Sequence, residues 1–149
     1  MHPFNIREAL LAKHAQHVVL IHFPIALCMA GVAFDFIAYW TKRSALATAA
    51  YYNFTVAAVF TLPVIATGLL AWQFQLEGQK LKGILLQHLI LGVVSSVMIC
   101  LVWYLHFRAR RAPDQTLPRY CFAIELAAIG LVAMTAHLGG YLSGVNISG

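Results

Sequence analysis

Four long apolar runs constrain this chain more than any other feature of its sequence. They cover residues 18–40, 46–72, 84–107 and 120–142, and a helix needs about 20 apolar residues to cross a bilayer. A core helix of a soluble domain would alternate with polar residues at a period near 3.6, which these runs do not do. With 61% hydrophobic and only 10% charged residues, the chain lies outside the range of soluble domains. The runs therefore predict four transmembrane helices.

The connections between the runs are short and polar: "TKRSA", "QFQLEGQKLKG" and "RARRAPDQTLPR". Short links favour antiparallel neighbours, so we expect an all-α integral membrane protein, a single domain over residues 1–149 that folds as an up-down four-helix bundle. The segment 1–17 mixes polar and apolar residues and is expected to lie in the membrane interface as an amphipathic segment before the first span.

Positive charge is unequal between the two membrane sides. The loops after the first and third spans carry six basic residues, Lys42, Arg43, Arg108, Arg110, Arg111 and Arg119, and the other side carries Arg7, Lys13, Lys80 and Lys82. Because short cytoplasmic loops are enriched in Lys and Arg, we expect a multi-pass protein of the bacterial inner membrane with both termini in the periplasm. The net charge of +5 thus reflects the bilayer, and nucleic acid is not an expected partner.

Three histidines are predicted at one membrane face. His22 lies near the start of the first span, His88 near the start of the third and His137 near the end of the fourth, and His17 lies on the same side nearer the surface. Histidine is costly inside a membrane and marks a functional site by default, and neutral imidazole is a common metal ligand. The convergence favours haem iron or another metal, although a histidine near a helix end is also a common interfacial residue. Pro24 is expected in the first turn of its helix, a favourable position for proline.

Small residues lie at helical spacing from these histidines: Gly92 follows His88, and Gly130 precedes His137. A porphyrin between helices needs small side chains where the macrocycle lies flat, so both glycines are candidate cofactor contacts. Small residues at such spacings also serve ordinary helix packing in membranes, and this alternative stays open.

Two carboxylates lie in the opposite half of the predicted bundle. Asp35 is about five residues before the end of the first span and Glu125 about five residues after the start of the fourth. Intramembrane carboxylates indicate function by default, and these two could bound a proton path or a quinone pocket. The alternative is that they pair with Arg108, Arg119 or His106.

Several motifs resemble one known family. They are "HVVLIHFPIAL" with "FD" further along the first span, "TGLLAW" in the second, "QHLILG" in the third and "AHLGGYLSGVNISG" at the end. Together they resemble the bacterial membrane family called domain of unknown function 2231, over nearly the whole chain, although "GYLSGVNISG" departs from the more charged ending of that family. Residue by residue, the family pattern marks His17, His22, Pro24, Asp35, Gly68, His88, His137, Gly139 and Gly140. Some members are fused to Rieske-type iron–sulfur domains, which implies a redox setting.

The resemblance adds His17 to the candidate ligands. His17 precedes His22 by five residues and so points roughly 140° away from it around a helix. The two histidines therefore cannot easily bind the same metal ion. We expect one haem b held by His22 and His88, with His137 as the rival ligand. His17 and His137 could complete a second haem. Iron with two histidine ligands has no open position, which fits electron transfer.

These expectations lead to a function. We expect a b-type cytochrome-like electron-transfer subunit of a larger respiratory or photosynthetic membrane complex, with a periplasmic electron carrier or a quinone as partner. Catalysis by this chain alone is not expected, because the sequence offers no nucleophile–base pairing and no phosphate loop. Two alternatives remain: a Cu, Zn or Fe site held directly by the same histidines, and a cofactor-free structural subunit of a membrane complex.

Overall fold

The computed structural model describes residues 13–113 and 116–143 and contains four long helices. They are α2 (Lys13–Thr41), α3 (Ser44–Gln75), α4 (Gly83–Arg111) and α5 (Tyr120–Leu142). Each helix is long and apolar enough to cross a bilayer, which confirms the predicted all-α, four-span architecture. Of the segment 1–17 for which an interfacial position is expected, residues 1–12 lie outside the described residues, and residues 13–17 form the first part of α2.

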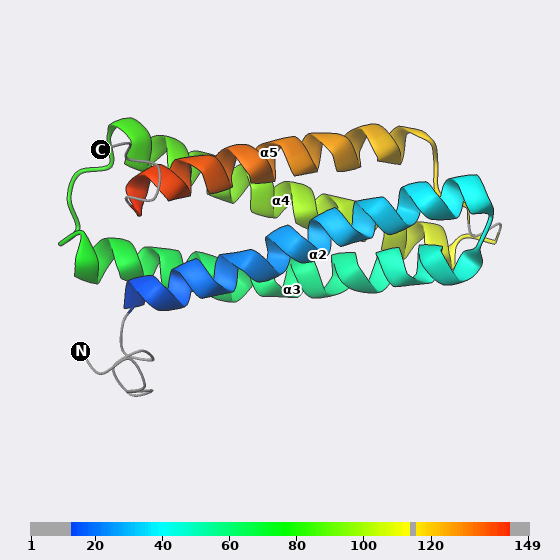
Figure 1. The fold of residues 1–149 in the computed structure, drawn as a ribbon, viewed down its shortest axis with the longest axis horizontal. Coiled ribbons are helices and arrows are strands. Elements are labelled where there is room, and N and C mark those ends of the chain that lie inside the picture. Colours follow the sequence, from blue (N-terminus) through cyan, green and yellow to red (C-terminus); the bar gives the residue numbers. More distant parts are fainter. Residues whose placement is uncertain (1–12, 114–115, 144–149) are drawn as a thin grey trace.

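The helices run alternately up and down and form two antiparallel pairs, α2 with α3 and α4 with α5 (Figure 1). The pairs also touch one another through α3 with α4 and through α2 with α5, so the four helices form a ring. The turn between α2 and α3 is tight because Lys42 adopts a left-handed conformation with φ of 58°. The start of α2, the loop between α3 and α4 and the end of α5 all lie at the opposite end of the bundle (Figure 1).

Apart from Phe54, small and medium apolar side chains form the buried core, while most large apolar side chains face outward, as expected in lipid. The buried core contains Cys28 and Val32 from α2, Ala50, Phe54 and Ala57 from α3, Ile99 and Val102 from α4, and Ala128 and Val132 from α5. These residues occupy the middle of the bundle and the half that carries the α2–α3 turn. The half at the other end is packed less completely and contains the cavity in which the candidate site lies.

Prolines occur inside two helices. Pro24 is the twelfth residue of α2 and is buried, so its expected place in the first helical turn is wrong. The helix begins at Lys13 instead, and residues 13–17 therefore continue into the span. A proline inside a helix lacks the N–H that would bond to the carbonyl four residues earlier, and Pro63 has the same effect in α3. Such interruptions are tolerated in membrane helices that neighbours support.

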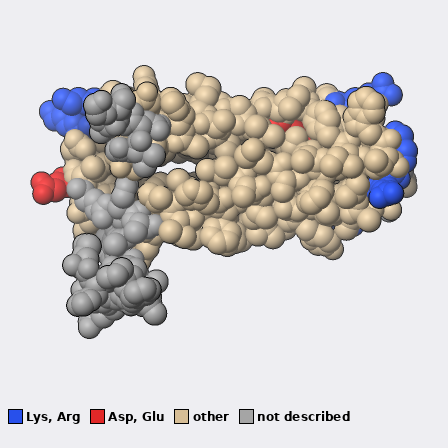
Figure 2. All heavy atoms as spheres, in the orientation of Figure 1, with Lys and Arg blue, Asp and Glu red and all other residues tan. Residues whose placement is uncertain are grey.

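Charged side chains gather at the two ends of the bundle, and the long middle section is almost entirely uncharged (Figure 2). A small red area within that section is the exception among the described residues in this view. The apolar middle section supports a membrane-embedded, multi-pass protein whose helices are surrounded by lipid.

Candidate functional site

A cavity of about 250 Å³ lies between the two helix pairs, in the half that carries the α3–α4 loop. Figure 2 shows the molecule hollowed between the pairs near this end. The cavity extends from Leu85 to Ile99 along α4, roughly 21 Å at a helical rise of 1.5 Å per residue. Its walls are mainly apolar, with contributions from Ile21, Ile25, Val64, Ile65, Leu69, Leu85, Leu89 and Val93. A long apolar cavity with a few polar groups is the usual form of a cofactor or ligand site.

The loop between α3 and α4 is tied down beside this cavity. Trp72, which lines the cavity, donates its indole N–H to the main-chain oxygen of Gln79 over 2.9 Å. This bond holds the loop against the end of α3. The tryptophan thus helps to shape the cavity, besides lying near a span end.

His17 contributes an imidazole to the cavity from α2. Its Nδ1 lies 3.3 Å from the hydroxyl oxygen of Thr67 on α3. The single hydroxyl hydrogen of Thr67 is directed to the main-chain oxygens of Pro63 and Val64, at 2.8 and 3.1 Å. Thr67 must therefore accept from His17, so the proton of the neutral ring is on Nδ1 and the lone pair is on Nε2.

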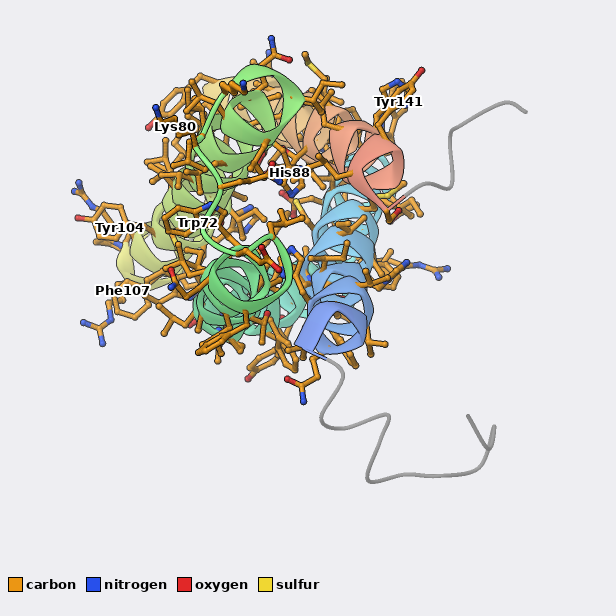
Figure 3. The ribbon with its side chains drawn as sticks, turned by 90° about the vertical axis from the view of Figure 1, so that its left-hand side faces the viewer. Trp72, Lys80, His88, Tyr104, Phe107 and Tyr141 are labelled. Carbon is orange, nitrogen blue, oxygen red and sulfur yellow. The ribbon has the colours of Figure 1, made fainter. Side chains whose placement is uncertain are left out.

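His88 contributes a second imidazole from α4 and points into the space among the four helices (Figure 3). Its Nδ1 lies 3.1 Å from the main-chain oxygen of Thr135 on α5. A carbonyl can only accept, so Nδ1 carries the hydrogen here too, and Nε2 carries the lone pair. Metal-bound histidines usually donate their second nitrogen to such an acceptor, which fixes the tautomer and the ring orientation.

Each of these rings lies against a glycine of the neighbouring helix. A Cβ added to Gly68 would stand 3.0 Å from Cε1 of His17, and one added to Gly139 would stand 3.2 Å from Cε1 of His88. A larger residue at either position would push the imidazole away. Two of the three glycines marked by the family pattern, Gly68 and Gly139, therefore make room for the two histidines that line the cavity.

Of the predicted ligand pair, His22 and His88, only His88 lines the cavity. His22 is exposed on α2 and donates its Nδ1–H to the carbonyl of Val18 in its own helix over 2.6 Å. His137, the predicted rival ligand, is also exposed, and its ring meets that of Tyr141 edge-on at 5.0 Å between centroids. Tyr141 points away from the bundle interior (Figure 3). Of the four candidate histidines, the cavity brings together His17 and His88.

The two candidate glycine contacts also differ. Gly92 lines the cavity, and a Cβ there would make an ordinary contact of 3.8 Å with Thr135. Gly130 is exposed and faces open space in the described part of the chain. Only Gly92 is placed to contact a ligand in the cavity.

A second group of polar side chains lies deep in the other half of the bundle. Asp35 from α2, His106 from α4 and Glu125 from α5 are 5%, 5% and 1% exposed. His106 Nε2 is 2.9 Å from Oε1 of Glu125 and 3.4 Å from Oδ2 of Asp35. Among the pairings weighed from the sequence, the structure shows the one with His106. Neither carboxylate lines the cavity, so the proton or quinone path assigned to them stays a prediction.

His106 is the functional candidate that the sequence reasoning did not place among its site residues. The available signal was topology, because it is the only histidine predicted on the same membrane side as the two carboxylates. Phe54 covers its ring at 4.7 Å between centroids.

Among the comparisons with known proteins, only the one with protein families gives a match. No curated protein and no solved structure matches it. Residues 13–146 match the family described as "Predicted membrane protein (DUF2231)", and because this match covers most of the 149 residues, the chain belongs to that family.

Proposed function

We propose that this protein binds haem b in the cavity between the helix pairs and serves as a membrane-bound electron-transfer subunit. The observation that carries the proposal is the pair of imidazoles from His17 and His88. Both line the cavity, and both use Nδ1–H to bond an acceptor on the neighbouring helix. Such bonding directs the basic nitrogen, Nε2, to a metal.

The proposal assigns His17 the role that the sequence suggested for His22. His17 comes from the α2–α3 pair and His88 from the α4–α5 pair, so an iron between them would be ligated from both sides of the cavity. The apolar walls suit the faces of a macrocycle, and Gly92 leaves space along α4. Iron with two histidine ligands is suited to electron transfer.

The proposed orientation follows from the charges. Lys42, Arg43, Arg108, Arg110, Arg111 and Arg119 all lie at the end opposite the cavity, and the positive-inside rule directs that end to the cytoplasm. In a bacterial inner membrane the haem would then lie near the periplasmic face. A periplasmic carrier or a membrane complex could exchange electrons with it there, and quinone could serve as a lipid-soluble partner.

The decisive experiment is a reduced-minus-oxidised absorption spectrum of the detergent-purified full chain, followed by haem quantification as the pyridine haemochrome. We expect about one haem per chain, since the cavity holds one pair of imidazoles. His17→Ala and His88→Ala should each lose the haem. His22→Ala is a matched control because it removes an exposed histidine of α2, the helix that carries His17. His137→Ala removes an exposed histidine at the same end of the bundle. Both variants should keep the haem.

Two results would overturn the proposal. A flat spectrum from folded protein purified from its native membrane would exclude a cytochrome and favour a cofactor-free structural subunit. Haem loss in His22→Ala with retention in His17→Ala would show that the iron lies outside the cavity.

A further inference from the structure

The group formed by Asp35, His106 and Glu125 has the properties of a metal site, and it lies apart from the histidine-lined cavity. One ligand atom from each of the three residues lies within 4.8 Å of the other two. The residues come from α2, α4 and α5, so three of the four helices meet at this point. All three residues are more than nine-tenths buried.

The group lacks hydrogen-bond donors. Oδ2 of Asp35 and Oε2 of Glu125 are buried without a hydrogen-bond partner in the described part of the chain. His106 offers one N–H at Nε2, and that atom lies 2.9 Å from Oε1 of Glu125. Buried polar atoms are almost always paired, and a cation bound to this group would satisfy the two carboxylate oxygens that have no hydrogen-bond partner.

Charge gives the same indication. With both carboxylates ionised and the imidazole neutral, the group would carry a net charge of −2, and within residues 13–113 and 116–143 the only basic side chain within ion-pair distance of either carboxylate is His106. Uncompensated charge is costly inside a membrane protein. A divalent cation would bring the sum to zero.

The distances fit such an ion. Metal–ligand bonds of about 2.0–2.2 Å to histidine nitrogen and carboxylate oxygen place the ligands of a tetrahedral ion roughly 3.3–3.6 Å apart. His106 Nε2 lies 3.4 Å from Oδ2 of Asp35 and 2.9 Å from Oε1 of Glu125. Small side-chain shifts would therefore bring all three atoms to bonding distance of one ion.

The surroundings would hold the ligands in place. Phe54 is fully buried and packs on the His106 ring, and Gly31 of α2 leaves the space that the Phe54 ring occupies. A closed, apolar shell excludes water and strengthens the attraction between an ion and its ligands.

We infer that Asp35, His106 and Glu125 form a binding site for a divalent first-row transition-metal ion such as Zn²⁺ or Mn²⁺. One nitrogen and two carboxylate oxygens are ligands that these ions accept, and the second oxygens of the carboxylates can complete the coordination. The ion would join α2 to the α4–α5 pair at the end opposite the cavity. This inference does not depend on haem binding.

The test is metal analysis of the full chain in detergent, first stripped with a chelator and then dialysed against Zn²⁺ or Mn²⁺. We expect about one equivalent of ion per chain for the unaltered protein. Asp35→Asn and Glu125→Gln keep side-chain size but remove negative charge, and each should lower the affinity by at least tenfold. Glu77→Gln, which alters an exposed carboxylate outside the cluster, should bind as the unaltered protein does.

A double variant, His17→Ala with His88→Ala, separates this site from the cavity. It should keep the ion while losing any haem. Loss of the ion in this variant would place the metal in the cavity and overturn the assignment. Equal binding by the unaltered protein and Glu125→Gln would also overturn it, as would failure of the folded, unaltered chain to bind either ion.

A thermal melt of the unaltered protein covers the case in which a cluster variant fails to fold. Ion addition should raise the melting temperature, and chelator should reverse the rise. An unchanged melting temperature at saturating ion would contradict the inference.

Discussion

His88 donates its Nδ1–H to the main-chain oxygen of Thr135, with 3.1 Å between the two atoms, and so links α4 to α5 beside the cavity. One helical turn further along α5, Gly139 leaves room for the same imidazole ring. A main-chain acceptor cannot be removed by exchanging a side chain. The packing of α5 against α4 therefore determines the position of the His88 ring. A substitution at Gly139 is the way to disturb this contact.

Gly139→Val should displace the His88 ring. The closest ring atom would be 3.2 Å from the new Cβ, and valine adds two methyl groups beyond it, so we expect a loss of about 1–3 kcal/mol in the free energy of unfolding. Haem occupancy should fall as well. Gly130→Val on the same helix meets open space and should change both quantities little. Denaturant titration in detergent and the haemochrome assay measure the two effects, and equal behaviour of the variants would contradict the arrangement.

Thr67→Val should weaken haem binding through His17. The substitution keeps the shape of the side chain but removes the oxygen that accepts from His17 Nδ1. Loss of such a supporting hydrogen bond typically lowers metal affinity by about 10–100-fold.

Thr55→Val is the matched control for Thr67→Val, because Thr55 lies in the same helix and its hydroxyl donates to the carbonyl of Tyr51. Haem titration of both variants after removal of the cofactor gives the comparison. The idea that Thr67 orients the ligand fails if the two variants bind haem equally well.

The four spans and their alternating direction could be predicted from the sequence because the bilayer imposes them. A run of about 20 apolar residues has few alternatives to a membrane-spanning helix. The same reasoning placed His17, His22, His88 and His137 at one end of the bundle, where the described structure also has them.

Which histidines face inward was not predicted. The sequence separates His17 from His22 by about 140° around the helix, and the only charged residue of the first span, Asp35, lies five helical turns after His17 on the same face. An intramembrane carboxylate faces the protein interior by default, so Asp35 was the signal that could have selected His17 over His22. Contacts between helices decide the rotation of α2, and they turn His17 toward Gly68 of α3. The pairing of His106 with Glu125 over 2.9 Å likewise depends on how α4 and α5 align along the bundle.

Gly31→Ala should destabilise the core next to the Asp35–His106–Glu125 group. A Cβ at Gly31 would come within 2.8 Å of Cε1 of Phe54, a ring that is fully buried. Because the buried ring would have to shift against its packed neighbours, we expect a loss of about 1–3 kcal/mol in the free energy of unfolding. Gly92→Ala is the control, because its Cβ would make an ordinary contact of 3.8 Å. Denaturant unfolding of both variants tests this, and a stable Gly31→Ala would contradict the packing described here.

Removal of His106 from the metal-free protein should be strongly destabilising. His106→Leu takes away the only basic side chain within ion-pair distance of Asp35 and Glu125 among the described residues. Removing this N–H donor leaves the buried Oε1 of Glu125 without its hydrogen bond, which costs about 1–3 kcal/mol and more where the acceptor is charged. Replacing both carboxylates as well, in the triple variant Asp35→Leu, His106→Leu, Glu125→Leu, should recover most of that loss, since buried ionic groups can often be exchanged for apolar ones without net cost.

The two variants together separate hydrogen bonding from packing. If the cluster is held by the hydrogen bonding of His106 to the carboxylates, the triple variant is more stable than His106→Leu alone, although it contains more substitutions. If His106 acts mainly by filling space beside Phe54, the losses add and the triple variant is the less stable of the two. Denaturant unfolding with chelator present decides between these outcomes. Repeating it with Zn²⁺ should stabilise only the unaltered chain, by about 2.7 kcal/mol at an ion concentration one hundred times the dissociation constant.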